Sequence, residues 1–214
     1  MKINDIPKIV PIFPLSNFVL FPKTSVPLNI FEPRYIDMIN DSMKSNKIIG
    51  MIQPKTLKNK NGIPNLYEVG CLGKIITFQE TEDSRYLIEL KGIIRFEKVK
   101  EIETDNKYRV LEVSCDKFAN DLNPKNEKLE FSDLKIIFKD LRSLFERKGF
   151  LINWKALEKQ NLNEIINALS MASPFSLDEK QILLEAKDLD IRKKNIIEIL
   201  KTYTHDIYEN TTIQ

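Results

Sequence analysis

The sequence predicts an α+β fold in which an N-terminal barrel-like β-domain carries one helix and a helical bundle follows it. Two patterns lead to this prediction. Proline-interrupted apolar runs over residues 9–31 and alternating apolar and polar residues over 67–115 are typical of strands, whereas apolar residues at helical spacing dominate the later part of the chain. A polar connector separates the halves, and we place the boundary so that residues 1–119 form the β-domain and residues 120–214 the bundle.

The first strands are expected in residues 9–13 and 26–31, which are rich in β-branched and aromatic side chains. Proline has no backbone N–H and cannot donate a hydrogen bond to a neighbouring strand. These strands should therefore lie at sheet edges or bulges rather than in the middle of a sheet. The prolines in and beside them are Pro11, Pro14, Pro22 and Pro27.

A helix is expected to begin at Pro33, directly after the second of these runs. Proline suits the first helical position, and Glu32 places a negative charge at the positive end of the helix dipole. The residues that recur at i, i+3 and i+4 spacing are Tyr35, Met38, Ile39, Ser42 and Met43.

Two different segments follow this helix. Residues 47–52 form an apolar run of strand length that Pro54 ends. Residues 55–65 contain several lysines together with Gly62 and Pro64, and they indicate an exposed loop. Its positive charge suits contact with phosphate, although a solvated loop tip explains the same residues.

Residues 67–115 alternate with the period of β-strands. A hairpin is expected around the turn at 82–84, and Gly92 is expected to separate it from a further strand at 93–99. Residues 107–115 add another strand. An open sheet of these strands would expose many unpaired edges, so we expect the strands to curl into a barrel or near-barrel.

Four apolar stripes with helical spacing predict the bundle. The first ends at Gly149, a residue type favoured just past a helix C-terminus. The third opens with a capping box, in which Ser176 and Glu179 exchange hydrogen bonds. Trp154 is interpreted as an anchor of the bundle rather than a ligand platform. The stripes lie within residues 131–145, 162–169, 176–186 and 189–208.

The composition is that of an ordinary globular chain. Its 214 residues carry a formal net charge of +2, from 33 basic and 31 acidic residues, so no overall field attracts nucleic acid or anionic lipid. The first residues lack the pattern of a secretory signal, and no stretch approaches the roughly 20 apolar residues of a membrane span. We therefore expect a cytoplasmic protein, without membrane or nucleic acid as a partner. Cys71 and Cys115 stand far apart and are interpreted as reduced, half-buried residues.

The sequence contains no recognisable catalytic or metal-binding constellation. None of the six glycines begins a phosphate-binding G-x-x-x-x-G-K-[ST] loop. His205 is the only histidine, and its place near the end of the last stripe is a poor anchor for a catalytic triad. One histidine and two isolated cysteines do not assemble a familiar zinc or iron site. We therefore expect no ATPase or other enzymatic activity, no cofactor and no metal.

One spaced series of residues runs through the first half of the chain: Pro14-Leu15, Phe21-Pro22, Pro27-Leu28, Ile30 to Tyr35, Ile49-Gly50-Met51, Val69 to Gly73, Arg85-Tyr86 and Gly92 to Phe96. This series resembles the Lon substrate-binding domain. More closely, it resembles the stand-alone bacterial proteins that carry this domain without the protease. Two positions depart from the family pattern, since Lys23 and Ser84 stand where glycine is common.

The resemblance implies a pseudo-barrel related to PUA-type folds and a non-catalytic role in recognising polypeptide. Unfolded or degron-bearing chains in protein quality control are the implied ligands, with a protease or chaperone as a further partner. RNA binding is the alternative, because PUA-type barrels include RNA binders. The near-neutral charge balance argues against that alternative.

The candidate peptide-binding residues lie in the proline-interrupted stretch. A strand edge there would leave unpaired backbone groups beside apolar side chains, which suits an extended peptide that adds by main-chain hydrogen bonds. Phe21 has a second interpretation, as a core residue that closes the barrel. Arg85 and Arg95 each precede an aromatic residue, and we expect both arginines to face water. The candidates are Phe18, Leu20, Phe21, Lys23, Val26 and Leu28.

Overall fold

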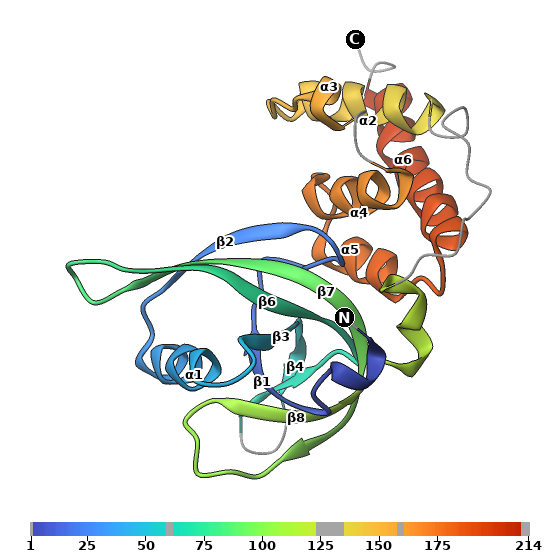
Figure 1. Cartoon of the computed structure of the whole chain (residues 1–214). Coiled ribbons are helices and arrows are strands. Elements are labelled where there is room, and N and C mark those ends of the chain that lie inside the picture. The colour runs from blue at the N-terminus through green and yellow to red at the C-terminus, as the bar shows by residue number, and fades with distance from the viewer. Residues whose placement is uncertain (1, 59–61, 123–134, 158–160, 211–214) are drawn as a thin grey trace. The chain divides into compact units, whose positions relative to one another are not determined.

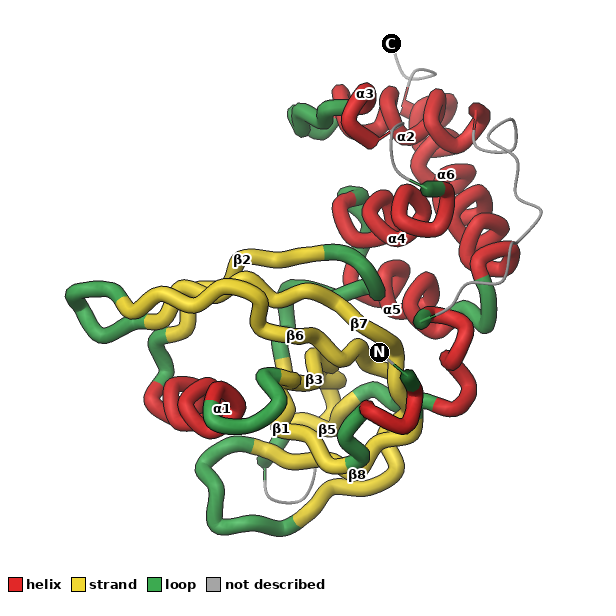
Figure 2. Tube along the Cα trace, viewed as in Figure 1, coloured by secondary structure: helices red, strands yellow, loops and turns green. Residues whose placement is uncertain are grey.

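The structure is a computed structural model that describes residues 2–58, 62–122, 135–157 and 161–210. It consists of two compact units, Met1–Pro124 and Lys125–Gln214. Strands build the first unit and helices build the second (Figures 1 and 2). The α+β class predicted from the sequence is confirmed. The units divide after residue 124, five residues later than the boundary after residue 119 that we predicted from the sequence.

A six-stranded sheet in the order β2-β7-β6-β3-β1-β8 forms the first unit, and β8 also pairs with β7. The second pairing closes β7, β6, β3, β1 and β8 into a ring, as the expected barrel requires. The strand β2 lies outside this ring and extends the sheet from β7 (Figure 1). The strands are β1 (Ile9–Pro14), β2 (Ser25–Ile30), β3 (Ile48–Ile52), β6 (Val69–Glu80), β7 (Tyr86–Ile102) and β8 (Arg109–Ser114).

The long strand β7 joins the barrel to its extension. Residues 86–91 pair with β2, residues 97–102 pair with β8, and β6 pairs with β7 along most of its length. The prediction that Gly92 separates two strands is wrong, because β7 continues through it. The register with β6 shifts here, between Leu72 and Gly73, so the position is a β-bulge and not a strand end.

The prediction of an edge position is wrong for β1, which lies between β3 and β8. The amide of Val113 donates to the carbonyl of Lys8. Backbone N–H and C=O groups of successive residues point to alternate sides of a strand. Lys8 faces β8, so the backbone nitrogen and carbonyl of Pro11 point away from β8. The pairing with β3 begins only at Ile12. The missing donor of Pro11 therefore falls on the side of β3, just before that pairing begins.

The helix α1 (Pro33–Met43) begins where the sequence predicts, with Pro33 in the first turn and Glu32 as the N-cap residue. The side chain of Tyr35 packs edge-on against Phe13, with ring centroids 4.5 Å apart. Tyr86 of β7 donates a hydrogen bond to Asn40 over 3.0 Å. The buried residues of the helix are Tyr35, Met38, Ile39 and Ser42, as the helical spacing predicted.

Residues 55–65 are not simply a loop. β4 (Pro54–Lys58) and β5 (Pro64–Leu66) form a two-stranded sheet. The expected exposure is found, because most side chains of β4 lie open to solvent. Two short 3-10 helices complete the described part of this unit, η1 (Ile3–Asp5) and η2 (Asp116–Asp121).

The second unit is helical, as predicted. Trp154 packs edge-on against Phe138 and Phe145, with 5.9 Å between ring centroids in both pairs, so its role as an anchor is confirmed. The capping box is present, since Ser176 N–H donates to the Glu179 carboxylate and the Glu179 amide donates to the Ser176 hydroxyl. Phe131 and Leu134 of the first stripe lie outside the described residues. The helices are α2 (Lys135–Arg147), α3 (Trp154–Leu157), α4 (Leu162–Ala172), α5 (Leu177–Glu185) and α6 (Leu189–Asn210).

Candidate functional site: a groove over β2, β7 and β6

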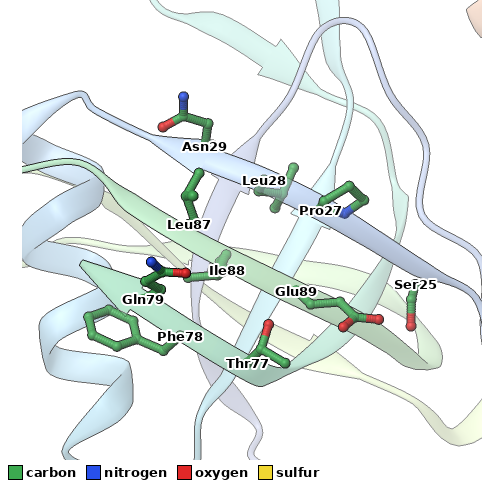
Figure 3. A pocket seen from close by; sticks show the side chains of 10 residues that line it. All are labelled: Ser25, Pro27, Leu28, Asn29, Thr77, Phe78, Gln79, Leu87, Ile88 and Glu89. Atoms are coloured by element: carbon green, nitrogen blue, oxygen red, sulfur yellow. The ribbon is translucent and has the colours of Figure 1, made fainter. Parts of the chain in front are cut away.

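A groove of about 650 Å³ lies over the three neighbouring strands β2, β7 and β6. Figure 3 shows the side chains that line it, which come from β2, the start of β7 and the end of β6. We call it the β2–β7–β6 groove. Its lining residues are Ser25, Pro27, Leu28, Asn29, Thr77, Phe78, Gln79, Leu87, Ile88 and Glu89.

The strand register determines which side chains face out in this region. Pro27 lies opposite Glu89, and Asn29 lies opposite Leu87. On the other side of β7, Thr77 also lies opposite Glu89. Directly opposite residues share a face of a sheet, so these side chains form one outward-facing surface. The alternate residues of β7, which are Tyr86, Ile88 and Leu90, are buried in the core.

The groove and its rim expose several large apolar side chains. Leu87 is 41% exposed on the outward face. Phe78 is 39% exposed, but it lies opposite the buried Ile88 and packs against Tyr86 with ring centroids 4.8 Å apart, so it belongs to the other face of the sheet. Phe31, the residue directly after β2, is 64% exposed, and the Arg85 guanidinium lies over its ring at 5.9 Å. Apolar surface of this kind is typical of ligand-binding positions.

One wall of the groove is the outer strand β2, which pairs with β7 and with no other described strand. The Gly92 amide donates to the carbonyl of Thr24 over 2.8 Å. By the alternation of an antiparallel ladder, Ser25, Pro27 and Asn29 then direct their backbone groups away from β7. Proline lacks an N–H, so this edge offers two amide donors and three carbonyl acceptors. The predicted edge strand is therefore present at β2.

The six predicted site residues do not lie together on the surface. Leu28 lines the groove, and Phe18 and Lys23 are half-buried outside it. Leu20, Phe21 and Val26 are buried in the core, with Phe21 at 0% exposed, so they offer no contact surface to a ligand. Phe21 thus fits its second interpretation, as a core residue. Leu87 and Phe78 were not among the predicted residues, although the alternation of 86–91 does place Leu87 on the face opposite the core.

Both departures from the family pattern occupy backbone conformations that favour glycine. Lys23 has a φ of 63° and Ser84 a φ of 60°. A left-handed conformation costs a non-glycine residue about 1–2 kcal/mol. The chain therefore keeps the loop shape that glycine would give at these positions and accepts the strain of a side chain.

The two arginines that precede aromatic residues differ from each other. Arg85 is exposed and pairs with Asp83 over 2.8 Å, as expected. The expectation that Arg95 faces water is wrong, because η2 covers this part of β7. Arg95 is buried, pairs with Asp121 over 2.8 Å and lies over the Phe118 ring at 4.3 Å.

The titratable groups with altered pKa values do not form a reactive site. Burial raises the pKa of the Cys115 thiol to about 12, so the thiol is protonated and a poor nucleophile at neutral pH. Burial, together with the hydrogen bond to Asp41, raises the pKa of Tyr108 to about 12. Within the described residues, no group of three or more His, Cys, Asp or Glu side chains is placed to hold a metal ion.

Comparison with known proteins places the chain in a family. The family model described as the ATP-dependent protease La (LON) substrate-binding domain matches residues 9–202. The chain belongs to the Lon substrate-binding domain family. The match extends across both units of the structure.

The curated relatives of this Lon-family chain are much longer than the chain itself. A Lon protease of Desulfosudis oleivorans is 27% identical over 208 residues, which is 92% of this chain and 25% of the relative. A Lon protease of Parabacteroides distasonis is 29% identical over 201 residues, 89% of this chain and 23% of the relative. The chain thus spans about a quarter of these proteins.

Solved structures share the fold of this Lon-family chain. A Lon N-terminal domain protein from Xanthomonas campestris aligns with a TM-score of 0.61 and 21% identity, over 90% of this chain and 97% of the other. The N-terminal domain of a Mycobacterium avium complex Lon protease aligns with a TM-score of 0.64 and 16% identity, over 91% and 98%. In the described part of the chain, no helix combines the length and apolarity needed to cross a membrane.

Proposed function

We propose that this Lon-family chain recognises polypeptide, and that an extended segment of the ligand lies in the β2–β7–β6 groove. One observation carries the proposal: exposed apolar side chains line the groove beside the outer edge of β2. The family's description as a substrate-binding domain supports the same ligand class.

The groove offers two kinds of contact to an extended segment. Leu87 and Pro27 supply apolar surface on the outward face, and burial of apolar surface is the main source of affinity in such complexes. The outer edge of β2 supplies backbone groups at Ser25 and Asn29 for main-chain hydrogen bonds. Pro27 has no N–H, so this edge cannot form a complete ladder of hydrogen bonds with a peptide. Side-chain contacts therefore contribute a larger share of the affinity than they would at an uninterrupted edge.

Polypeptide fits this groove better than RNA does. None of the ten residues that line it is basic, and Glu89 places a negative charge at its centre. RNA recognition requires positive charge for the phosphates and aromatic faces for the bases.

We further propose that the chain acts in the cytoplasm without catalysis, and that it delivers unfolded or degron-bearing polypeptides to a protease or chaperone.

A pair of matched leucine variants tests the groove. Leu87→Ser removes apolar surface from the groove, whereas Leu57→Ser removes a 75% exposed leucine from β4, outside it. Fluorescence anisotropy with a labelled, permanently unfolded polypeptide measures the affinity of each variant. We expect affinity to fall about five- to tenfold for Leu87→Ser, in the range of a contact residue, and to stay unchanged for Leu57→Ser. Equal affinities for both variants and the parent chain would refute the groove as the binding site.

A further inference from the structure

The two ends of the β2–β7–β6 groove carry opposite charges. At one end, Lys74 of β6 lies directly opposite Lys91 of β7, which in turn lies opposite Ser25 of β2. Both lysines are exposed, and neither forms an ion pair with a described residue. Like charges at directly opposite positions destabilise a sheet. A negative group that lies between the two ammonium groups would offset this repulsion.

Lys23 adds a third positive charge at the same end. Its amide donates to the carbonyl of Gly92, the residue next to Lys91. This bond places Lys23 beside the lysine pair, in a left-handed conformation with a φ of 63°. Lys23 likewise has no carboxylate partner among the described residues. The nearest acidic lining residue along β7 is Glu89, which offsets only one of the three charges.

The opposite end is acidic. Glu82 and Asp83 lie in the hairpin turn that follows β6, whereas Glu80, the last residue of β6, lies opposite Tyr86 and so faces the other side of the sheet. Arg85 pairs with Asp83 and offsets one of these charges. Lys74 and Glu80 lie six positions apart on β6, which corresponds to roughly 20 Å of strand. An extended peptide of about six residues has the same length.

We propose that the groove selects extended segments that have apolar residues in the middle and a carboxylate at one end, which binds between Lys74 and Lys91. The inference rests on the proposed function, because it specifies the ligand of the same groove. The carboxylate is either the α-carboxylate of a chain end or an Asp or Glu side chain. A cationic group at the other end of the segment then lies near the acidic turn of Glu82 and Asp83.

Three labelled peptides of about eight residues test this preference and distinguish the two sources of the carboxylate. All share one apolar core. The first has a free C-terminal carboxylate, the second is amidated, and the third is amidated but carries Asp near the same end. We expect the first or the third to bind about two- to fivefold more tightly than the second, as an exposed ion pair contributes, and the advantage to disappear at high salt. If only the first is favoured, the ligand is a chain terminus. If the third is also favoured, acidic side chains suffice.

A charge reversal with a matched control locates the effect. Lys91→Glu reverses one charge of the lysine pair, and Lys8→Glu makes the same change in net charge at an exposed lysine that does not line the groove. We expect Lys91→Glu to weaken binding of the carboxylate-bearing peptide about three- to tenfold and to favour a peptide that carries lysine at that end instead. Lys8→Glu should leave both affinities unchanged. Equal binding of all peptides, or equal effects of both variants, would overturn the proposal.

The two sets of variants distinguish a wrong carboxylate preference from a wrong assignment of the groove as the binding site. If Leu87→Ser weakens binding and the charge variants do not, the groove binds polypeptide but does not select a carboxylate. If Lys91→Glu and Leu87→Ser both leave binding of a tight ligand unchanged, both the groove and its selectivity are refuted.

Discussion

The backbone amide of Lys23 donates a hydrogen bond to the carbonyl oxygen of Gly92 over 2.8 Å. In return, the Gly92 amide donates to the carbonyl of Thr24 over 2.8 Å. These two bonds attach the loop before β2 to the middle of β7. A Cβ atom at Gly92 would overlap the carbonyl oxygen of Phe21, so only glycine permits this approach. The position of β2, and with it one wall of the groove, depends on this contact.

Gly92→Ala should therefore destabilise the fold. The added methyl group meets backbone atoms, which cannot rotate away, and overpacking of this kind costs about 1–3 kcal/mol. We expect a loss near the upper end of this range, measured by urea unfolding. Gly62→Ala is the control, because a Cβ there meets no atom within 4 Å and only its φ of 76° opposes the change. A smaller cost for Gly92→Ala than for Gly62→Ala would contradict the packing argument.

Lys23→Gly should stabilise the protein. Glycine removes the left-handed strain of about 1–2 kcal/mol. Its greater conformational freedom in the unfolded state costs about 0.5–1 kcal/mol of stability. A net gain of about 0.5 kcal/mol in the free energy of unfolding is expected. Ser25→Gly, two residues later in β2, should instead lose stability. If Lys23→Gly proves as destabilising as Ser25→Gly, the strain assigned to Lys23 is absent.

Phe21→Ala tests whether this residue belongs to the core. Phe21 is fully buried, and truncation of a buried phenylalanine costs about 3–5 kcal/mol. Phe31→Ala removes the same group from a residue that is 64% exposed, and we expect a cost under about 1 kcal/mol. Denaturant melts of both variants measure the difference. A cost under 1 kcal/mol for Phe21→Ala would return this residue to the candidate binding surface.

Asp121→Ala tests the buried ion pair of the first unit. The change leaves the Arg95 guanidinium buried without this carboxylate, which costs about 3–5 kcal/mol in comparable pairs. Glu97→Ala breaks the exposed pair with Lys117 and should cost under about 1 kcal/mol. Thermal unfolding of the two variants provides the comparison. Similar small losses would mean that Arg95 finds water or another partner.

Local signals in the sequence predicted local structure well. Pro33 after Glu32 marked the start of α1, and Ser176 with Glu179 marked the start of α5. These signals work because capping and proline geometry act within a few residues of the chain. The alternation in 86–91 also predicted which side chains of β7 enter the core.

Features that depend on pairing between distant segments were not predictable in the same way. The register between β6 and β7 shifts between Ile75 and Thr77, so simple alternation from the buried Ile75 assigns Thr77 to the core, although Thr77 is exposed and lies opposite Glu89. The burial of Arg95 depends on Asp121, which lies 26 residues away. The groove has the same origin, because the register of three strands brings Leu87, Asn29 and Gln79 side by side. Only Leu28 of the predicted site lines it.

The most direct test of polypeptide recognition is an NMR titration, in which a peptide that binds the chain is added stepwise to the isotope-labelled chain. Our account predicts that the amide signals of Ser25, Asn29, Thr77 and Leu87 shift together as peptide is added, while those of β4 and β8 stay in place. Saturation of these shifts at one common affinity would support a single site in the groove. Shifts confined to other surfaces, or none at peptide concentrations that saturate binding by anisotropy, would contradict the account.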